Sequence, residues 1–184
     1  MAIIYNRDQN WLLGLSCDSQ KNDSSLHIFR RGKKPIHENV YLICSFEWST
    51  TMDLLPDMHH VVIGGSNKRT GGTKSFIEVL RVTEENIVST LKYDLTKVLT
   101  KQDVTRIRVF DEHSRFLVGS SQMALVMQIS KGCSKIKLLA KVPLSYPQVH
   151  DVWFTNFELI AVCLDDDQIS RVVFEGWNAV PPKK

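Results

Sequence analysis

The side chains best suited to bind a charged partner lie in two short basic segments. The first is RRGKKP, which contains Arg30, Arg31, Lys33 and Lys34. Segments of this composition bind phosphate groups, serve as nuclear-localisation signals or form solvated turns between strands. We therefore expect these four residues in an exposed turn, where they are candidate contacts for a partner.

The second basic segment is GGSNKRTGGTKS, residues 64–75, which at first sight resembles a phosphate-binding loop. A P-loop carries a lysine directly after the last glycine of its motif and leads into a helix. Here Thr73 separates Lys74 from the glycine pair, and strand-like segments lie on both sides. The pattern predicts an exposed hairpin loop in which Lys68, Arg69 and Lys74 are candidate contacts for an acidic partner.

Residues suited to catalysis or metal binding are scattered. The six histidines form no HExxH motif, and the four cysteines show no CxxC spacing. Three consecutive aspartates, residues 165–167, have no histidine at a matching spacing and are typical of an exposed turn. We therefore predict no catalytic residue, no metal site and no cofactor, and we predict that the chain is not an enzyme. Cys17, Cys44 and Cys163 lie in apolar runs and are expected to be reduced and buried.

Short strands must position these residues. Valine and isoleucine together number 31 and alanine only 5, which favours pleated strands over helices. Short apolar runs alternate with turns rich in Gly, Asp, Asn, Ser and Pro. Residues 87–98 have apolar side chains at helical as well as strand spacing, so a helix and an outer strand followed by a crossover both remain open.

A two-strand phrase recurs four times along the chain. Each copy joins an apolar run, with a small residue near its end, to an alternating strand that follows a polar gap. The small residues are Gly14, Gly64, Gly119 and Ala161. Further strands flank most copies, which gives about four strands per ~40–50 residues, the unit of a β-propeller blade. Since one such sheet cannot bury both faces by itself, blades must stack, and the small residues are predicted where neighbouring blades crowd.

The sequence therefore predicts an all-β fold. We expect a propeller-like array of about four antiparallel four-stranded blades over residues 1–176, forming part of a larger propeller, and an extended tail over residues 177–184 that carries Trp177 as a candidate docking residue. An array that is not closed leaves apolar faces and unpaired strand edges in water. We expect a partner chain, a second copy or the remainder of a longer protein to cover the Met1–Cys17 edge, the Gln168–Trp177 edge, or both.

Several stretches carry a resemblance to a known family: SLHIFRRGKKPIHENVYLICSFEW, HHVVIGGSNKRTGGTKSFIEVLRV, VTRIRVFDEHSRFLVGSS and the segment 141–175. They resemble the propeller region shared by the A-subunit family of the cleavage and polyadenylation specificity factor and the large subunit of the damaged-DNA-binding complex. The chain departs from that pattern at Leu164-Asp165, where the family usually has Gly-Asp. The resemblance implies a rigid scaffold in nuclear assemblies, such as ubiquitin ligases, RNA-processing or chromatin complexes, and it brings no catalytic residues.

Charge and hydropathy narrow the function further. The net charge of +3 argues against a strongly basic nucleic-acid-binding surface. No apolar run approaches the ~20 residues needed to cross a bilayer, and the first residues lack the pattern of a signal peptide. We predict an intracellular, nuclear protein that acts as a non-enzymatic protein–protein interaction scaffold. The alternative is a propeller surface that contacts nucleic acid through the basic segments and through Arg106 and Arg108.

Overall fold

The computed structural model describes residues 2–8, 11–18, 23–30, 39–42, 48–67, 73–83, 86–110, 112–143, 149–154, 159–165 and 168–174. Within these residues the chain forms fifteen strands and a single short helix, so the prediction of an all-β fold is confirmed. None of the described segments is a helix long and apolar enough to cross a membrane.

The strands pair into four antiparallel sheets in chain order. The first sheet comprises β1 (Ala2–Asn6), β2 (Trp11–Asp18), β3 (Asp23–Arg30) and β4 (Asn39–Leu42). The second comprises β5 (Trp48–Leu54), β6 (His60–Asn67), β7 (Lys74–Val82) and β8 (Ile87–Asp94). The third comprises β9 (Arg106–Val109), β10 (Arg115–Gly119), β11 (Met123–Ile129) and β12 (Ile136–Pro143). The fourth comprises β13 (Val149–Phe154), β14 (Leu159–Asp165) and β15 (Gln168–Phe174).

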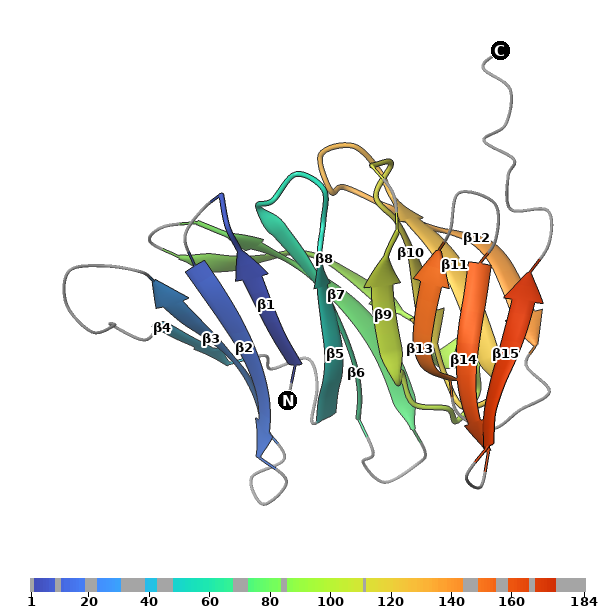
Figure 1. Cartoon of the computed structure of the whole chain (residues 1–184). Helices are drawn as coiled ribbons and strands as arrows, with labels where there is room; N and C mark the ends of the chain where they lie inside the picture. The colour runs from blue at the N-terminus through green and yellow to red at the C-terminus, as the bar shows by residue number, and fades with distance from the viewer. Residues whose placement is uncertain are drawn as a thin grey trace, which may run out of the picture.

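Each sheet is a meander in which every strand pairs with its neighbour in the chain. The sheets stand in a row, with β1–β4 at one end and β13–β15 at the other (Figure 1). The first sheet contacts the second through β5, the second contacts the third through β5 and β9, and the third contacts the fourth through β9 and β10. The main packing contacts therefore run between consecutive sheets.

Two apolar cores fill the spaces between the first three sheets. Alternation along β6 supplies both, because successive side chains of a strand point to opposite faces. Val61 and Ile63 belong to the core shared with the first sheet, and Val62 belongs to the core shared with the third. Burial of one such side chain contributes about 1.5–3 kcal/mol. The second sheet is consequently covered on both faces.

The segment with two readings, residues 87–98, forms a strand and then a short helix. Strand β8 runs to Asp94, and α1 (Thr96–Leu99) follows it directly. Leu95 and Leu99 are buried in the core between the second and third sheets. The outer-strand alternative is thus confirmed, and the helix is reduced to one turn of the crossover toward β9.

The predicted role of the small residues holds at Gly64 and is wrong at Gly14. A Cβ added at Gly64 would lie 2.6 Å from Val104 Cγ1 and 2.7 Å from Ile107 Cδ1, so only glycine allows β9 to approach this closely. Gly14 instead lies on the opposite face of its strand from Leu13 and Leu15, which pack against the second sheet. When the repeats are aligned on their small residues, Gly14 is one residue away from the position that faces the neighbouring sheet. A shift of one residue moves a side chain to the opposite face of a strand.

Candidate functional site

The first sheet has one face that no apolar core of the described residues covers. Its inner face supplies Trp11, Leu13, Leu15, Leu26 and Ile28 to the core with the second sheet. The alternate positions form what we call the outer face: Ile3, Tyr5, Leu12, Gly14, Ser16, Ser25, His27 and Phe29. Ile3 and Tyr5 are 55% and 53% exposed, which is unusual for large apolar side chains on a sheet.

A hollow of about 350 Å³ lies on this outer face, and it is lined by Ile3, Leu12, Gly14, Leu15, Ser16, His27 and Phe29. Gly14 pairs with Ile3 on one side and with His27 on the other. Because glycine has no side chain, the middle of the face is recessed between these neighbours. A Cβ at Gly14 would meet Phe29 Cε2 at 3.4 Å, an ordinary contact. A methyl group would therefore fit at Gly14 without a clash, whereas Gly64 accommodates a neighbouring strand.

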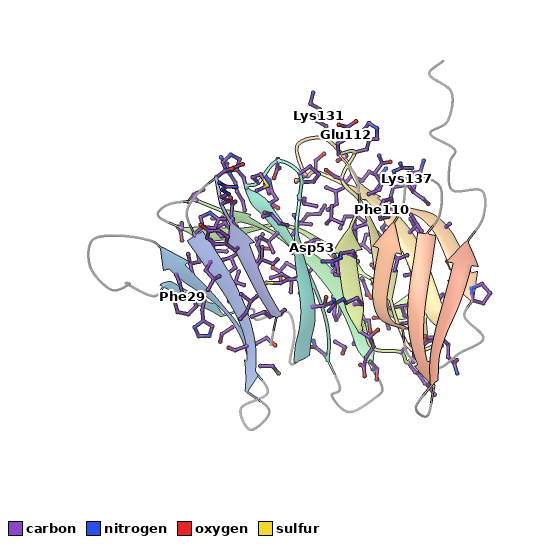
Figure 2. All side chains as sticks on the ribbon, in the orientation of Figure 1. Phe29, Asp53, Phe110, Glu112, Lys131 and Lys137 are labelled. Atoms are coloured by element: carbon purple, nitrogen blue, oxygen red, sulfur yellow. The ribbon has the colours of Figure 1, made fainter. Side chains whose placement is uncertain are left out.

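One side of the hollow is held by a polar contact. Ser16 Oγ and His27 Nε2 are 2.8 Å apart, and the His27 ring stacks on the Phe29 ring with a centroid separation of 6.3 Å. Figure 2 places Phe29 at the β1–β4 end of the row of sheets. These contacts fix both rings, so the hollow is a preformed, mainly apolar recess with one hydrogen-bonding group beside it.

The second group of interest is a cluster formed by Asp57, His60 and Cys133. One ligand atom from each side chain lies within 4.8 Å of the other two. Asp57 Oδ2 lies 2.6 Å from His60 Nδ1, and Asp57 Oδ1 accepts hydrogen bonds from the backbone N–H groups of His59 and His60. Cys133 approaches from the turn between β11 and β12, and its side chain is buried.

The environment of the cluster changes the pKa of two of its members. Burial raises the pKa of the Cys133 thiol, and the nearby charge of Asp57 raises it further. Burial also tends to raise the pKa of Asp57, but the hydrogen bonds from His59 and His60 outweigh it and bring the pKa below the ordinary value. At neutral pH the cluster thus contains a carboxylate beside a protonated thiol.

Sequence reasoning missed this cluster because its parts are far apart in the chain. Asp57 and His60 are three positions apart in a turn, but Cys133 lies in another sheet, and no local motif joins them. The prediction that Cys17 is buried is wrong: it lies near the end of β2 and is exposed. The apolar run does place Cys17 in a strand, but no other described residues cover the end of β2 where this side chain lies.

Of the predicted partner contacts, only the side chain of Lys74 falls within the described part of the chain, and it is exposed at the start of β7. Lys74 is near enough to Asp94 for its charge to help lower the pKa of that carboxyl. The other side chains lie outside the described residues: Arg30, Arg31, Lys33, Lys34, Lys68, Arg69 and Trp177.

Arg108, considered above as a nucleic-acid contact, lies beside an acidic residue of the second sheet. Its Nη1 is 3.9 Å from Asp53 Oδ2. Arg106 also contributes favourable charge to Asp53. Part of the positive charge of β9 is therefore balanced within the protein.

Comparisons with known proteins bear on the fold. No protein-family model and no curated protein matches the sequence. Solved structures that match include hydrazine synthase from Kuenenia stuttgartiensis (TM-score 0.68, 8% identity, 94% of this chain and 58% of that chain). The major Malassezia sympodialis allergen Mala s 1 matches with a TM-score of 0.63 and 11% identity, over 91% of this chain and 60% of that chain. A putative 6-phosphogluconolactonase from Bacteroides uniformis matches with a TM-score of 0.64 and 9% identity, over 96% and 53%.

The neighbours correct one prediction. Since they include proteins named hydrazine synthase and putative 6-phosphogluconolactonase, the conclusion that this chain is not an enzyme is wrong: a fold of this kind without a recognisable catalytic motif does not exclude catalysis. At such low identities the likeness describes the fold alone. This chain spans little more than half of each of these three neighbours. Its antiparallel all-β fold is similar to propeller-type folds, as the sequence predicts.

Proposed function

We propose that this chain is a protein–protein interaction scaffold: an arc of propeller-type sheets whose outer face on the first sheet is covered by another polypeptide. The observation that carries the proposal is the recessed apolar outer face around Gly14. Contiguous exposed apolar surface of this kind marks interaction sites on soluble proteins.

The interior of the row indicates what such a face binds. The second sheet turns Val61 and Ile63 toward the first sheet, and both are fully buried there. The outer face of the first sheet offers Ile3, Tyr5 and Leu12 in a comparable arrangement, but Ile3 and Tyr5 remain half exposed. The partner that suits this surface is therefore another antiparallel sheet with an apolar face.

We assign that sheet to a second copy of this chain. The chain spans 58%, 60% and 53% of three solved neighbours, so two copies supply about the chain length of one such propeller-type protein. The first and fourth sheets lie at opposite ends of the row (Figure 1). Packing of the first sheet of one copy against the fourth sheet of the other, twice, closes a ring with two-fold symmetry.

The assembly belongs, in this proposal, to a larger nuclear complex of the kind implied by the resemblance to the polyadenylation-factor and damaged-DNA-binding families. Microscopy of the tagged full chain tests the location.

The nucleic-acid alternative predicts binding that weakens steeply with salt. Because Arg108 lies beside Asp53, part of the positive charge of β9 is balanced within the protein, which makes β9 less suited to bind nucleic acid.

Sedimentation equilibrium of the full chain tests the scaffold proposal. We expect a dimer at micromolar concentration and a shift to monomer in Tyr5→Glu, because a carboxylate on the outer face would be buried unpaired. Val88→Glu is the matched control, since Val88 is 49% exposed on β8, away from this face. A cooperatively folded monomer at every concentration, or a dimer that Tyr5→Glu leaves intact, contradicts the proposal.

A further inference from the structure

The β5–β6 connection and the β11–β12 hairpin meet at one end of the sheets. Both loops lie at the upper edge of the view in Figure 1, and Lys131 marks the hairpin in Figure 2. Leu55 from the connection and Cys133 and Ile136 from the hairpin belong to one buried apolar core. The two loops come from different sheets but are packed together.

The connection holds Asp57 and His60 in a fixed geometry. The backbone N–H groups of Met58 and Leu55 donate to the carbonyl oxygens of Leu55 and His60, at 3.0 and 2.8 Å. Asn6 Nδ2 of the first sheet donates to the carbonyl oxygen of Met58 at 2.7 Å. The loop is therefore held by its own backbone hydrogen bonds and by the hydrogen bond from the first sheet. These bonds fix the backbone that carries Asp57 and His60.

The hairpin presents Cys133 from the other side. The N–H of Cys133 donates to the carbonyl oxygen of Ser130 at 2.9 Å, and the N–H of Ser130 donates to that of Lys135 at 2.9 Å. Gly132 and Cys133 have φ values of 81° and 53°, so two successive left-handed residues form the turn. The thiol is directed toward the core rather than into solvent.

From this juxtaposition we infer a zinc site in which Asp57, His60 and Cys133 are the protein ligands. In zinc sites the metal lies about 2.0–2.3 Å from its oxygen, nitrogen and sulfur ligands, which places ligand atoms roughly 3.5 Å apart in a tetrahedron. The three ligand atoms here lie within 4.8 Å of one another, which is close to the spacing that a bound ion requires.

The donor set selects the kind of metal. A thiolate and an imidazole favour zinc over magnesium or calcium, which take oxygen ligands. On binding, the thiol proton is released to solvent, and the carboxylate and the thiolate together balance the 2+ charge of the ion. The imidazole binds as a neutral ligand, with its hydrogen on the ring nitrogen that does not face the metal. Three protein ligands leave a fourth position for water, and Asp57, whose side chain is 45% exposed, lies on the solvent side of the cluster.

Such a site would join the second sheet to the third. Zinc coordination would link the β5–β6 connection of the second sheet to the β11–β12 hairpin of the third. With water in the fourth position, it would share with catalytic zinc sites the arrangement of three protein ligands and one open position.

Zinc and cobalt titration of the full chain tests this inference. We expect one zinc ion per chain in competition with a chromophoric chelator, and a thiolate-to-cobalt charge-transfer band with Co²⁺. Cys133→Ser should abolish the band, and His60→Gln should weaken zinc binding at least tenfold. The matched controls are Cys17→Ser and His59→Gln, because Cys17 and His59 are exposed and lie outside the cluster.

Circular dichroism shows whether each variant is folded. If Cys133→Ser does not fold, the loss of zinc affinity in His60→Gln tests the site instead. Zinc should also raise the Tm of the parent and of both controls, but not of the cluster variants. Absence of stoichiometric zinc binding by the parent, or a charge-transfer band that survives in Cys133→Ser, overturns the site and leaves Asp57 and His60 as a hydrogen-bonded pair.

Discussion

Asp53 of β5 and Val109 of β9 are joined across the interface between the second and third sheets. The backbone N–H of Val109 donates to Asp53 Oδ2 at 2.8 Å, although the two residues are 56 positions apart. A second bond runs from the N–H of Ile107 to Thr51 Oγ1 at 2.9 Å. Strand β9 is the edge of its sheet, so side chains of β5 satisfy N–H groups that an edge strand would otherwise leave unpaired.

Replacement of Asp53 by alanine should destabilise the protein by about 1–3 kcal/mol, because the Val109 N–H then lacks its acceptor at a largely buried position. Urea unfolding measures the change. Glu112→Ala is the control, since the Glu112 side chain is 87% exposed in a turn, and it should change the free energy of unfolding by less than about 0.5 kcal/mol. Equal effects of the two substitutions would contradict the role of Asp53.

The pH dependence of stability should differ in sign between two aspartates. Burial raises the pKa of Asp53 above 3.8, so its contribution is complete below pH 3.8 and is lost as the pH rises through the folded-state pKa. Hydrogen bonds from His59 and His60 outweigh burial and lower the pKa of Asp57 below 3.8, so its contribution is present above that pH and is lost as the pH falls.

Unfolding of the parent, Asp53→Asn and Asp57→Asn at a series of pH values measures these contributions. We expect the stability gap between the parent and Asp53→Asn to narrow as the pH rises, and the gap for Asp57→Asn to narrow as the pH falls. Two gaps that change in the same direction would be inconsistent with these assignments.

Alanine should have opposite effects at two glycines. At Gly64 a Cβ would lie 2.6 Å from Val104 and 2.7 Å from Ile107, so overpacking should cost about 1–3 kcal/mol. At Gly14 the nearest contact would be 3.4 Å, and alanine should stabilise the chain by up to about 1 kcal/mol. Thermal unfolding distinguishes them, and a Gly64→Ala variant as stable as Gly14→Ala would refute the close packing of β9.

The cysteines Cys17 and Cys133 should react at very different rates. Cys17 is exposed, whereas Cys133 is buried and its pKa is raised first by burial and then by the charge of Asp57. Since the thiolate is the reactive form, alkylation with iodoacetamide in the absence of added metal should label Cys17 first, as read by peptide mass. Early labelling of Cys133 in folded protein would argue against its burial.

The periodicity of the sequence predicts the strands well because alternation directly reflects which residues are buried. It predicts the position of Gly64 correctly for the same reason. It fails at Gly14, because the repeat can be aligned either on Gly14 or on a neighbouring apolar residue. Which of these side chains faces the second sheet depends on how β2 pairs with β1 and β3. It cannot find the Asp57–His60–Cys133 cluster, because that cluster depends on how two separate sheets stack.

The arrangement of the sheets in a row has a consequence for how the molecule comes apart. The main contacts join consecutive sheets, so the energy of the chain is close to a sum of sheet terms and nearest-neighbour terms, as in a linear array. The first sheet can then detach while the core between the second and third sheets stays intact. Backbone amides of β2 and β3 should exchange with solvent through this partial opening, whereas those of β6 and β7 require the loss of both neighbouring cores.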